Sequence, residues 1–310
     1  MNLSIVVPCF NEEEVLPESA KRLGQLLQSL INQGLVSAQS TIYFIDDGSS
    51  DSTWRLIESL NEKNTHLSGI KLSRNQGHQN ALLAGLLTAP GDVIISLDAD
   101  LQDDIDVIPE MLKEFRQGAE IVYGVRISRT SDSFFKRFTA QRYYQLMSYF
   151  GIDIIPDHAD YRLMSRRALS ALNNFNEVNL FLRGVIPLLG FKTAKVFYER
   201  HPRLAGTTKY PLHRMLALAF EGITSFSSVP LKFITWLGGI ISFSAMLTGV
   251  WALFIKIFTD TAIPGWASIV VPIYFLGGLQ MLSLGIIGGY LAKIYSETKR
   301  RPRFIIEKSL

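Results

Sequence analysis

The sequence predicts an α/β domain with a mainly parallel sheet, followed by a helical hairpin in the membrane. Within the first 125 residues, short apolar runs alternate with stretches of helical spacing, which is typical of a parallel sheet covered by helices. Polar clusters follow three of these runs, and such clusters meet at the carboxyl edge of a parallel sheet. Two apolar runs near residues 233–258 and 264–292 can each cross the roughly 30 Å hydrocarbon layer, which takes about 20 helical residues.

The elements of the α/β domain follow from these patterns, and we place its end at about residue 210. Strands are expected at Ser4–Val7, Thr41–Ile45, Gly69–Leu72, Val93–Leu97 and Ile121–Tyr123. Helices are expected at Val15–Leu30, Thr53–Leu60, Asn80–Leu87 and Ile105–Phe115.

Two amphipathic segments lie between the sheet and the apolar runs. Residues 133–150 mix aromatic and basic side chains, which fits either a helix at a lipid interface or a packing helix with a solvated basic edge. Residues 211–230 place apolar side chains at spacings of three and four. We favour an interfacial helix there, because the segment leads directly into a membrane span.

The connector and the flanking charges predict the topology of the hairpin. Only Thr259–Thr261 separates the two apolar runs, so both ends of the hairpin lie on one side of the membrane. Basic residues follow the second run in the tail at 296–310, and basic residues remain cytoplasmic. We therefore expect an integral membrane protein of a bacterial inner membrane, with two spans and with the α/β domain and both termini in the cytoplasm.

Composition narrows the class of protein further. The net charge of +3 is too small to indicate a nucleic-acid partner. The single cysteine, Cys9, excludes an intrachain disulfide and fits a reducing compartment. The Leu3–Val7 run ends at Pro8 and predicts a strand, so we expect no signal peptide.

An Asp-x-Asp pair, Asp98–Asp100, follows the fourth predicted strand. Two carboxylates at a strand end can hold Mg²⁺ or Mn²⁺ bridging a diphosphate, and Gln102 lies close by in the sequence. Asp103 and Asp104 are expected in a solvated acidic turn that caps the next helix.

A second acidic loop, Asp46–Asp51, follows the second predicted strand. Gly48 allows a tight turn and close approach by a ligand. Asp47 can accept hydrogen bonds from a base or a ribose hydroxyl. The alternative for this loop is a turn in which Asp51 or Ser52 caps the following helix.

Three basic residues are suited to phosphate oxygens. Arg126 follows the last predicted strand, while Arg203 and Lys209 flank Gly206 just before the second amphipathic segment. The alternative is that the juxtamembrane cations bind anionic lipid headgroups.

Asp157 and Asp160 are candidates for the acceptor side of a transfer reaction. Either one could act as a base or orient the acceptor. A phosphate acceptor, with a second pKa of about 6, is already ionised and has less need of a strong base. The alternative for Asp160 is a structural pair with Arg162.

These segments together resemble the family-2 glycosyltransferases that act on polyprenyl phosphates, and most closely the bacterial bactoprenol glucosyltransferases. The match covers essentially the whole chain. Its runs are Val6–Glu12, Asp46–Asp51, Arg74–Gly77, Asp98–Gln102, Tyr161–Leu163 and Gly206–Pro211.

The resemblance implies a GT-A fold and a set of site residues. It places Asp157, favoured over Asp160, with Arg203 and Lys209 in catalysis, and Asp98, Asp100 and Gln102 at the metal. The nucleotide sugar would be bound by Pro8, Phe10, Glu12, Asp47, Asp98, Ala99, Gln102 and Arg126.

The implied reaction is inverting transfer of glucose from UDP-glucose to undecaprenyl phosphate, with a divalent metal as cofactor. One alternative is the same chemistry with a mannose or aminoarabinose type of sugar. Another is a non-catalytic scaffold or lipid carrier with a vestigial nucleotide fold. A processive synthase is disfavoured, because its Gln-x-x-Arg-Trp signature and additional spans are absent from the sequence.

Glycines in the second span predict a homo-oligomer, with a tetramer as the expected assembly. Gly285 and Gly289 form a small-xxx-small face suited to close helix contact. The alternative is that this face packs the two spans of one hairpin.

Overall fold

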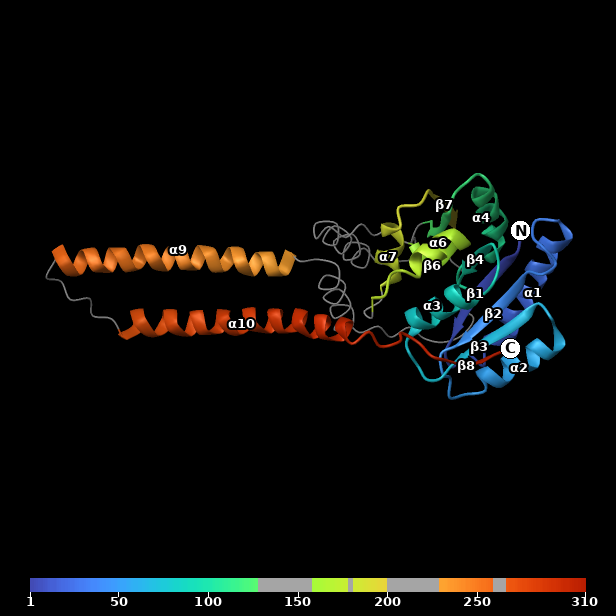
Figure 1. The fold of residues 1–310 in the computed structure, drawn as a ribbon, viewed down its shortest axis with the longest axis horizontal. Helices are drawn as coiled ribbons and strands as arrows, with labels where there is room; N and C mark the ends of the chain where they lie inside the picture. The colour runs from blue at the N-terminus through green and yellow to red at the C-terminus, as the bar shows by residue number, and fades with distance from the viewer. Residues whose placement is uncertain (128–157, 178–180, 200–228, 259–265) are drawn as a thin grey trace.

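The structure, a computed structural model, describes residues 1–127, 158–177, 181–199, 229–258 and 266–310. Figure 1 shows an α/β domain from which two long helices project side by side. The sheet has eight strands in the order β7-β5-β6-β4-β1-β2-β3-β8. The α/β class and the mainly parallel sheet that the sequence predicts are confirmed, although two strands run antiparallel to their neighbours.

The first part of the domain contains every strand and helix that the sequence predicts. Strand β1 pairs in parallel with β2 and β4, and β2 pairs in parallel with β3. The elements are β1 (Leu3–Cys9), α1 (Leu16–Asn32), β2 (Thr41–Asp46), α2 (Thr53–Lys63), β3 (Leu67–Leu72), α3 (His78–Thr88), β4 (Val93–Ser96), η1 (Ile105–Val107), α4 (Ile108–Arg116) and β5 (Ile121–Arg126).

The second part of the domain adds two strands that the apolar pattern did not indicate. Its elements are β6 (His158–Ser165), α6 (Arg166–Leu172), α7 (Leu182–Leu188) and β7 (Thr193–Tyr198). Strand β6 lies antiparallel between β4 and β5, with Leu163 opposite both Ile95 and Val122. This insertion brings Asp160 to the end of β4, where the Ser96 hydroxyl donates to the Asp160 carbonyl at 2.6 Å.

Two buried layers hold the sheet between its helices. Helices α1, α2 and α4 cover one face, and α3, α6 and α7 cover the other. Helix α3 packs closely, since a Cβ added at Gly85 would lie 2.3 Å from Val6 Cγ1. The buried residues of α3 run without a break from Ala81 to Leu86. The core therefore fixes the position of the start of α3, which lies at the carboxyl edge of the sheet.

The end of the chain returns to the α/β domain and completes the sheet. Strand β8 (Ile306–Ser309) pairs antiparallel with β3, within the segment for which the sequence predicts a basic tail. The Leu310 side chain lies beside Gly69, together with Trp54 and Ile57. Because an uncovered edge strand presents unpaired N–H and C=O groups, β8 satisfies part of the β3 backbone.

Helices α9 (Val229–Phe258) and α10 (Trp266–Thr298) carry most of the exposed large apolar side chains. Among the described residues, one segment, Phe275–Thr298, is long and apolar enough to cross a membrane. An exposed apolar surface of this extent indicates a membrane or a protein partner. The first span stays a prediction, and the amphipathic segments at 133–150 and 211–228 lie outside the described residues.

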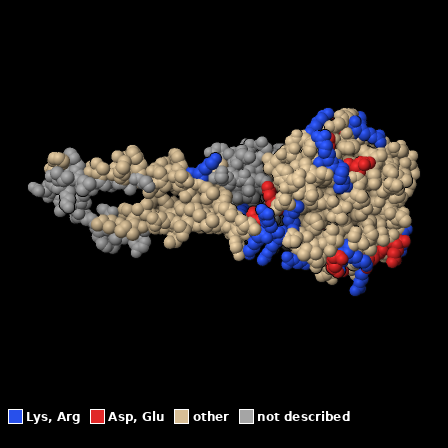
Figure 2. Space-filling view, in the orientation of Figure 1, with Lys and Arg blue, Asp and Glu red and all other residues tan. Residues whose placement is uncertain are grey.

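Basic side chains gather where α10 meets the α/β domain, as Figure 2 shows. This cluster includes Lys299, Arg300 and Arg301, all exposed. Basic residues favour the cytoplasmic side of a membrane helix. The basic end of α10 lies next to the α/β domain, to which the chain returns through β8, and the cytoplasmic placement of both stays a prediction.

Gly285 and Gly289 lie on an exposed face of α10. A Cβ added at Gly285 or Gly289 would meet no atom of the described residues within 4 Å. The homo-oligomer and the packing of the two spans of one hairpin therefore both stay predictions.

We expect that Leu310→Ala lowers the free energy of unfolding of the α/β domain by about 1–2 kcal/mol, because a partly buried leucine loses its packing against the core. Lys308→Ala is the matched control. It removes an exposed ion pair with Glu58, at 2.7 Å, which contributes less than about 1 kcal/mol. Equal stability of wild type and Leu310→Ala in chemical denaturation would show that β8 does not stabilise the sheet.

Candidate active site

Three polar loops meet at the carboxyl edge of the sheet, after β1, β2 and β4. The first two are hydrogen-bonded to each other: the Asn11 amide donates to Ser49 Oγ at 2.9 Å, and the Ser50 amide donates to Asn11 Oδ1 at 2.9 Å. Asn11 has a φ of 54°, a left-handed conformation that asparagine tolerates well. The polar clusters that follow separate strands in the sequence thus form one surface.

Three of the predicted nucleotide-binding residues lie at the end of β1 and in the loop after it. Pro8 is buried within β1, whereas the Phe10 ring is exposed at the edge of the sheet. The Glu12 amide donates to Thr53 Oγ1 at 2.9 Å, which ties this loop to the start of α2. Phe10 is therefore positioned to offer a ring face to a ligand.

The Asp47 carboxylate binds the turn before α3. Its Oδ1 accepts from the Gln76 amide at 2.7 Å, and its Oδ2 accepts from the Gly77 amide at 2.9 Å. Burial raises the pKa of Asp47, although these two hydrogen bonds oppose the shift. Each oxygen keeps a second lone pair, so Asp47 can organise this turn and still accept from a ligand.

Gly48 allows a close approach of two protein loops. A Cβ at this position would lie 2.6 Å from the backbone carbonyl carbon of Arg74, and Gly48 has a φ of +68°. The close approach that the sequence predicts for a ligand is made instead by the turn at residues 74–75.

This turn places His78, the first residue of α3, between two carboxylates. Its Nε2 lies 3.5 Å from Asp98 Oδ1 and 3.4 Å from Asp160 Oδ2. Burial would lower the pKa of His78, but Asp160 and Asp98 outweigh it and raise that pKa. The sequence analysis missed His78. The available signal was its position directly after the Arg74–Gly77 run.

Asp160 forms the structural pair that the sequence leaves open, and it has additional partners. Arg162, fully buried, binds Asp160 Oδ1, and Arg183 Nη2 lies 3.1 Å from Asp160 Oδ2. Burial alone would raise the pKa of Asp160, but the hydrogen bond to His78 and the two guanidinium groups hold it well below its usual range. A carboxylate in this state is a poor proton acceptor, which disfavours Asp160 as a base.

Asp98 is suited to a cation. Its Oδ1 is enclosed and accepts no hydrogen bond from the described residues, and the nearby His78 Nε2 lies 3.5 Å from it. Burial raises the pKa of Asp98 to about 6, with His78 opposing and neighbouring carboxylates adding to the shift. No group of three or more acidic, His or Cys side chains in the described part of the chain could hold a metal alone. A metal here would draw on Asp98, Asp100 and Gln102, with diphosphate and water oxygens as further ligands.

The acidic turn after Gln102 differs from the prediction at one residue. Asp104 accepts from the Asp106 amide at 2.9 Å and caps η1, as expected. Asp103 is 3% exposed instead of solvated, because Arg126 Nη2 donates to its Oδ1 at 3.0 Å and the Tyr198 hydroxyl donates to the same oxygen. Arg126 thus anchors the loop behind Asp98 through Asp103.

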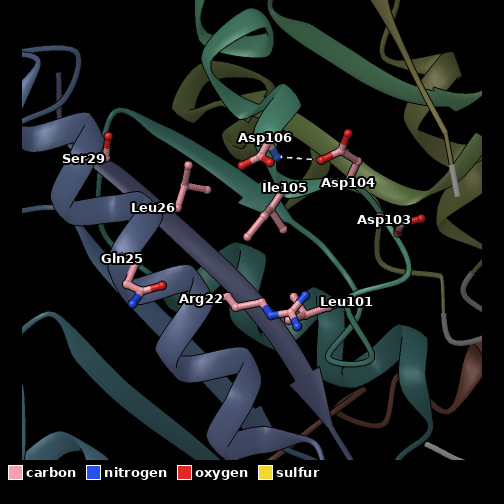
Figure 3. A pocket seen from close by; sticks show the side chains of 9 residues that line it. All are labelled: Arg22, Gln25, Leu26, Ser29, Leu101, Asp103, Asp104, Ile105 and Asp106. Atoms are coloured by element: carbon pink, nitrogen blue, oxygen red, sulfur yellow. Dashed lines mark hydrogen bonds between the residues drawn. The ribbon is translucent and has the colours of Figure 1, made fainter. Parts of the chain in front are cut away.

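A pocket of about 390 Å³ lies between α1 and the loop that follows Gln102 (Figure 3). Asp104, Ile105 and Asp106 form one side of it, and α1 forms the other. It contains none of the predicted site residues. The lining residues are Arg22, Gln25, Leu26, Ser29, Leu101, Asp103, Asp104, Ile105 and Asp106.

Asp157, Arg203 and Lys209 lie outside the described residues. The structure therefore brings together the predicted nucleotide and metal residues, and it adds His78 and Arg183 beside them.

Comparison with known proteins identifies the family. The model of the family described as "Glycosyl transferase family 2" matches residues 4–172, from β1 to the end of α6. The chain belongs to glycosyl transferase family 2.

Full-length relatives support this membership. The chain is 51% identical to "Uncharacterized glycosyltransferase YkoT" of Bacillus subtilis (strain 168), over 99% of this chain and 92% of that protein. It is 39% identical to "Prophage bactoprenol glucosyl transferase homolog" of Escherichia coli (strain K12), over 99% of each. It is 37% identical to "SfII prophage-derived bactoprenol glucosyl transferase" of Shigella flexneri, over 100% of this chain and 98% of that protein.

Among solved structures, mannosyl-3-phosphoglycerate synthase from Rubrobacter xylanophilus aligns with a TM-score of 0.49 and 14% identity, over 71% of each chain.

We expect Asp47→Ala to speed hydrogen exchange at the Gln76 and Gly77 amides, because both lose their acceptor. Gln76 is half-buried and Gly77 is exposed, so the loss of these two hydrogen bonds should lower the free energy of unfolding by about 1–3 kcal/mol. Ser50→Ala is the matched control, since it removes only a 3.3 Å contact with Asn11 in the neighbouring loop. Unchanged exchange at residues 76 and 77 in the Asp47 variant would mean that the carboxylate does not hold this turn.

Proposed function

We propose that this family-2 glycosyltransferase moves glucose from UDP-glucose to undecaprenyl phosphate at the cytoplasmic face of a bacterial inner membrane. The observation that carries the proposal is full-length similarity to proteins described as bactoprenol glucosyl transferases, in a chain that joins a polar sheet edge to exposed apolar helices. A soluble sugar donor and a membrane lipid would meet at this junction.

The donor would bind in a GT-A arrangement along the loops after β1, β2 and β4. Phe10 would stack on the base, while Glu12 and Asp47 would accept hydrogen bonds from the nucleoside. Asp98, Asp100 and Gln102 would hold Mg²⁺ or Mn²⁺, and the enclosed Oδ1 of Asp98 supports this assignment. The bound metal would neutralise diphosphate charge that develops on the departing group.

The transfer would proceed by direct displacement with inversion. An oxygen of the acceptor phosphate attacks the anomeric carbon, and the bond from that carbon to the donor's β-phosphate oxygen breaks with its electron pair. UDP leaves, and the lipid keeps a single phosphate that now carries the sugar. The acceptor oxygen needs no deprotonation, because a phosphate monoester is already ionised at neutral pH. This agrees with the low pKa of Asp160.

The remaining residues have roles that follow from the resemblance. Asp157 would position the acceptor, and Arg203 and Lys209 would stabilise the departing diphosphate. Helices α9 and α10 would both span the membrane, with the exposed glycine face of α10 joining subunits of a homo-oligomer.

The direct test is acceptor-dependent transfer in nanodiscs with a panel of radiolabelled UDP-glucose, UDP-N-acetylglucosamine and GDP-mannose. We expect label in the lipid fraction only with polyprenyl phosphate present, and most from UDP-glucose. A preference for GDP-mannose would mean that the transferred sugar is mannose and that the type of reaction is unchanged. No lipid label from any donor would favour a non-catalytic scaffold.

Asp100→Ala should lower transfer by about 100-fold or more, because the diphosphate loses metal-borne stabilisation in the transition state. Excess chelator should have the same effect on wild type, reversed by Mg²⁺ or Mn²⁺. Asp104→Ala is the matched control, since this nearby carboxylate only caps η1. Full activity in chelator, or equal losses in the two variants, would contradict the metal assignment.

A further inference from the structure

Two basic side chains from separate helices converge on one buried carboxylate. His78 comes from the start of α3 and Arg183 from α7, and both contact Asp160 Oδ2, at 3.4 Å and 3.1 Å. The Asp160 side chain is 7% exposed, whereas those of His78 and Arg183 are 46% and 40% exposed. The Asp160 carboxylate thus lies on the buried side of this cluster, and the His78 and Arg183 side chains form its solvent-facing rim.

Two guanidinium groups contact the Asp160 carboxylate, and the His78 imidazole lies between it and a second carboxylate, Asp98. Arg162, fully buried on the same strand, already binds Asp160 and balances its charge. Arg183 adds a second guanidinium to this carboxylate from the solvent side. An arginine on the rim of a site attracts anions, and its guanidinium matches phosphate oxygens geometrically.

The cluster lies directly beside the proposed donor site. His78 Nε2 is 3.5 Å from Asp98 Oδ1, so one imidazole separates Asp160 from the carboxylate assigned to the metal. In Figure 1, α7 lies at the end of the α/β domain nearest α9 and α10. An anion bound at this rim would be close to the sugar donor and on the side of the domain that faces the membrane helices.

We propose that His78 and Arg183 bind the phosphate of the lipid acceptor, with Asp160 as the positioning residue that orients both. This proposal rests on the proposed function and names the acceptor subsite within it. Direct displacement requires the attacking oxygen within about 3–3.5 Å of the anomeric carbon. A phosphate held by His78 would lie next to Asp98, on the side of the proposed donor site.

The test uses the full chain in nanodiscs, with farnesyl phosphate as the acceptor probe and farnesol and inorganic phosphate as comparisons. Binding is measured by calorimetry without donor, and transfer is measured with saturating UDP-glucose. Arg183→Ala should weaken farnesyl phosphate binding and raise its KM by about tenfold or more, as expected for a lost charge-assisted contact. The KM for the donor should change far less, and Arg183→Lys should recover part of the affinity. His78→Ala should weaken binding in the same direction.

Arg167→Ala is the matched control. This arginine of α6 is 72% exposed and pairs with Glu120 at 3.5 Å, away from the cluster. We expect it to bind and transfer as wild type does. If Arg183→Ala does not fold, Arg183→Gln removes the charge, keeps a hydrogen-bond donor for Asp160, and decides the question by the same criterion.

Three results would overturn the proposal: equal farnesyl phosphate binding by wild type and Arg183→Ala, a rise confined to the donor KM, or binding of farnesol as tight as that of farnesyl phosphate. Inorganic phosphate that binds as tightly as farnesyl phosphate would also overturn it, because the site would then recognise no lipid. Phosphate-dependent probe binding that requires Arg183, without sugar transfer, would support the subsite and refute the proposed function. Failure of the acceptor-subsite proposal can therefore be distinguished from failure of the proposed function.

Discussion

Burial of the Asp160 carboxylate is the constraint on which the site depends. A charged group removed from water is tolerated only when it is paired, and breaking such a pair typically costs about 3–5 kcal/mol. Asp160 obtains its partners from three elements: Arg162 from β6, Arg183 from α7 and His78 from α3. The need to pair the Asp160 carboxylate therefore fixes how β6, α7 and α3 meet at the carboxyl edge of the sheet. The Asp47 carboxylate supports the same arrangement from the other side, because it holds the turn from which α3 begins.

The parallel part of the fold was predictable because its strands are apolar runs bounded by polar loops. Strands β6 and β8 were not, since both carry charged residues that a pattern of apolar runs cannot detect: Asp160 and Arg162 in β6, and Glu307 and Lys308 in β8. These strands form only because the sheet offers an open position between β4 and β5 and an open edge at β3. The C-terminal strand also ties α10 to the sheet, which shortens the connection between the membrane helix and the domain that carries the site.

The same distinction applies to the site. The polar loops were predictable because each directly follows a strand, and adjacent strands bring their ends together. Pairings between residues that are distant in the sequence were not predictable. Arg126 was assigned to phosphate from its position after the last predicted strand, yet it ends β5 and binds Asp103. The register of β5 with β7 brings Tyr198 to the same carboxylate. His78 and Arg183 are single residues in ordinary helical contexts, and only the tertiary structure shows that they share Asp160.

The central claim is that a lipid phosphate attacks the sugar directly, beside a carboxylate cluster that contributes no base. The most direct measurement is the ³¹P spectrum and mass of the lipid product formed from UDP-glucose and undecaprenyl phosphate, together with the nucleotide released. The account predicts a lipid with one phosphorus, now a phosphodiester to a hexose, and one UDP for each lipid formed. A lipid diphosphate with release of UMP would show that a sugar phosphate was transferred, and it would contradict the account.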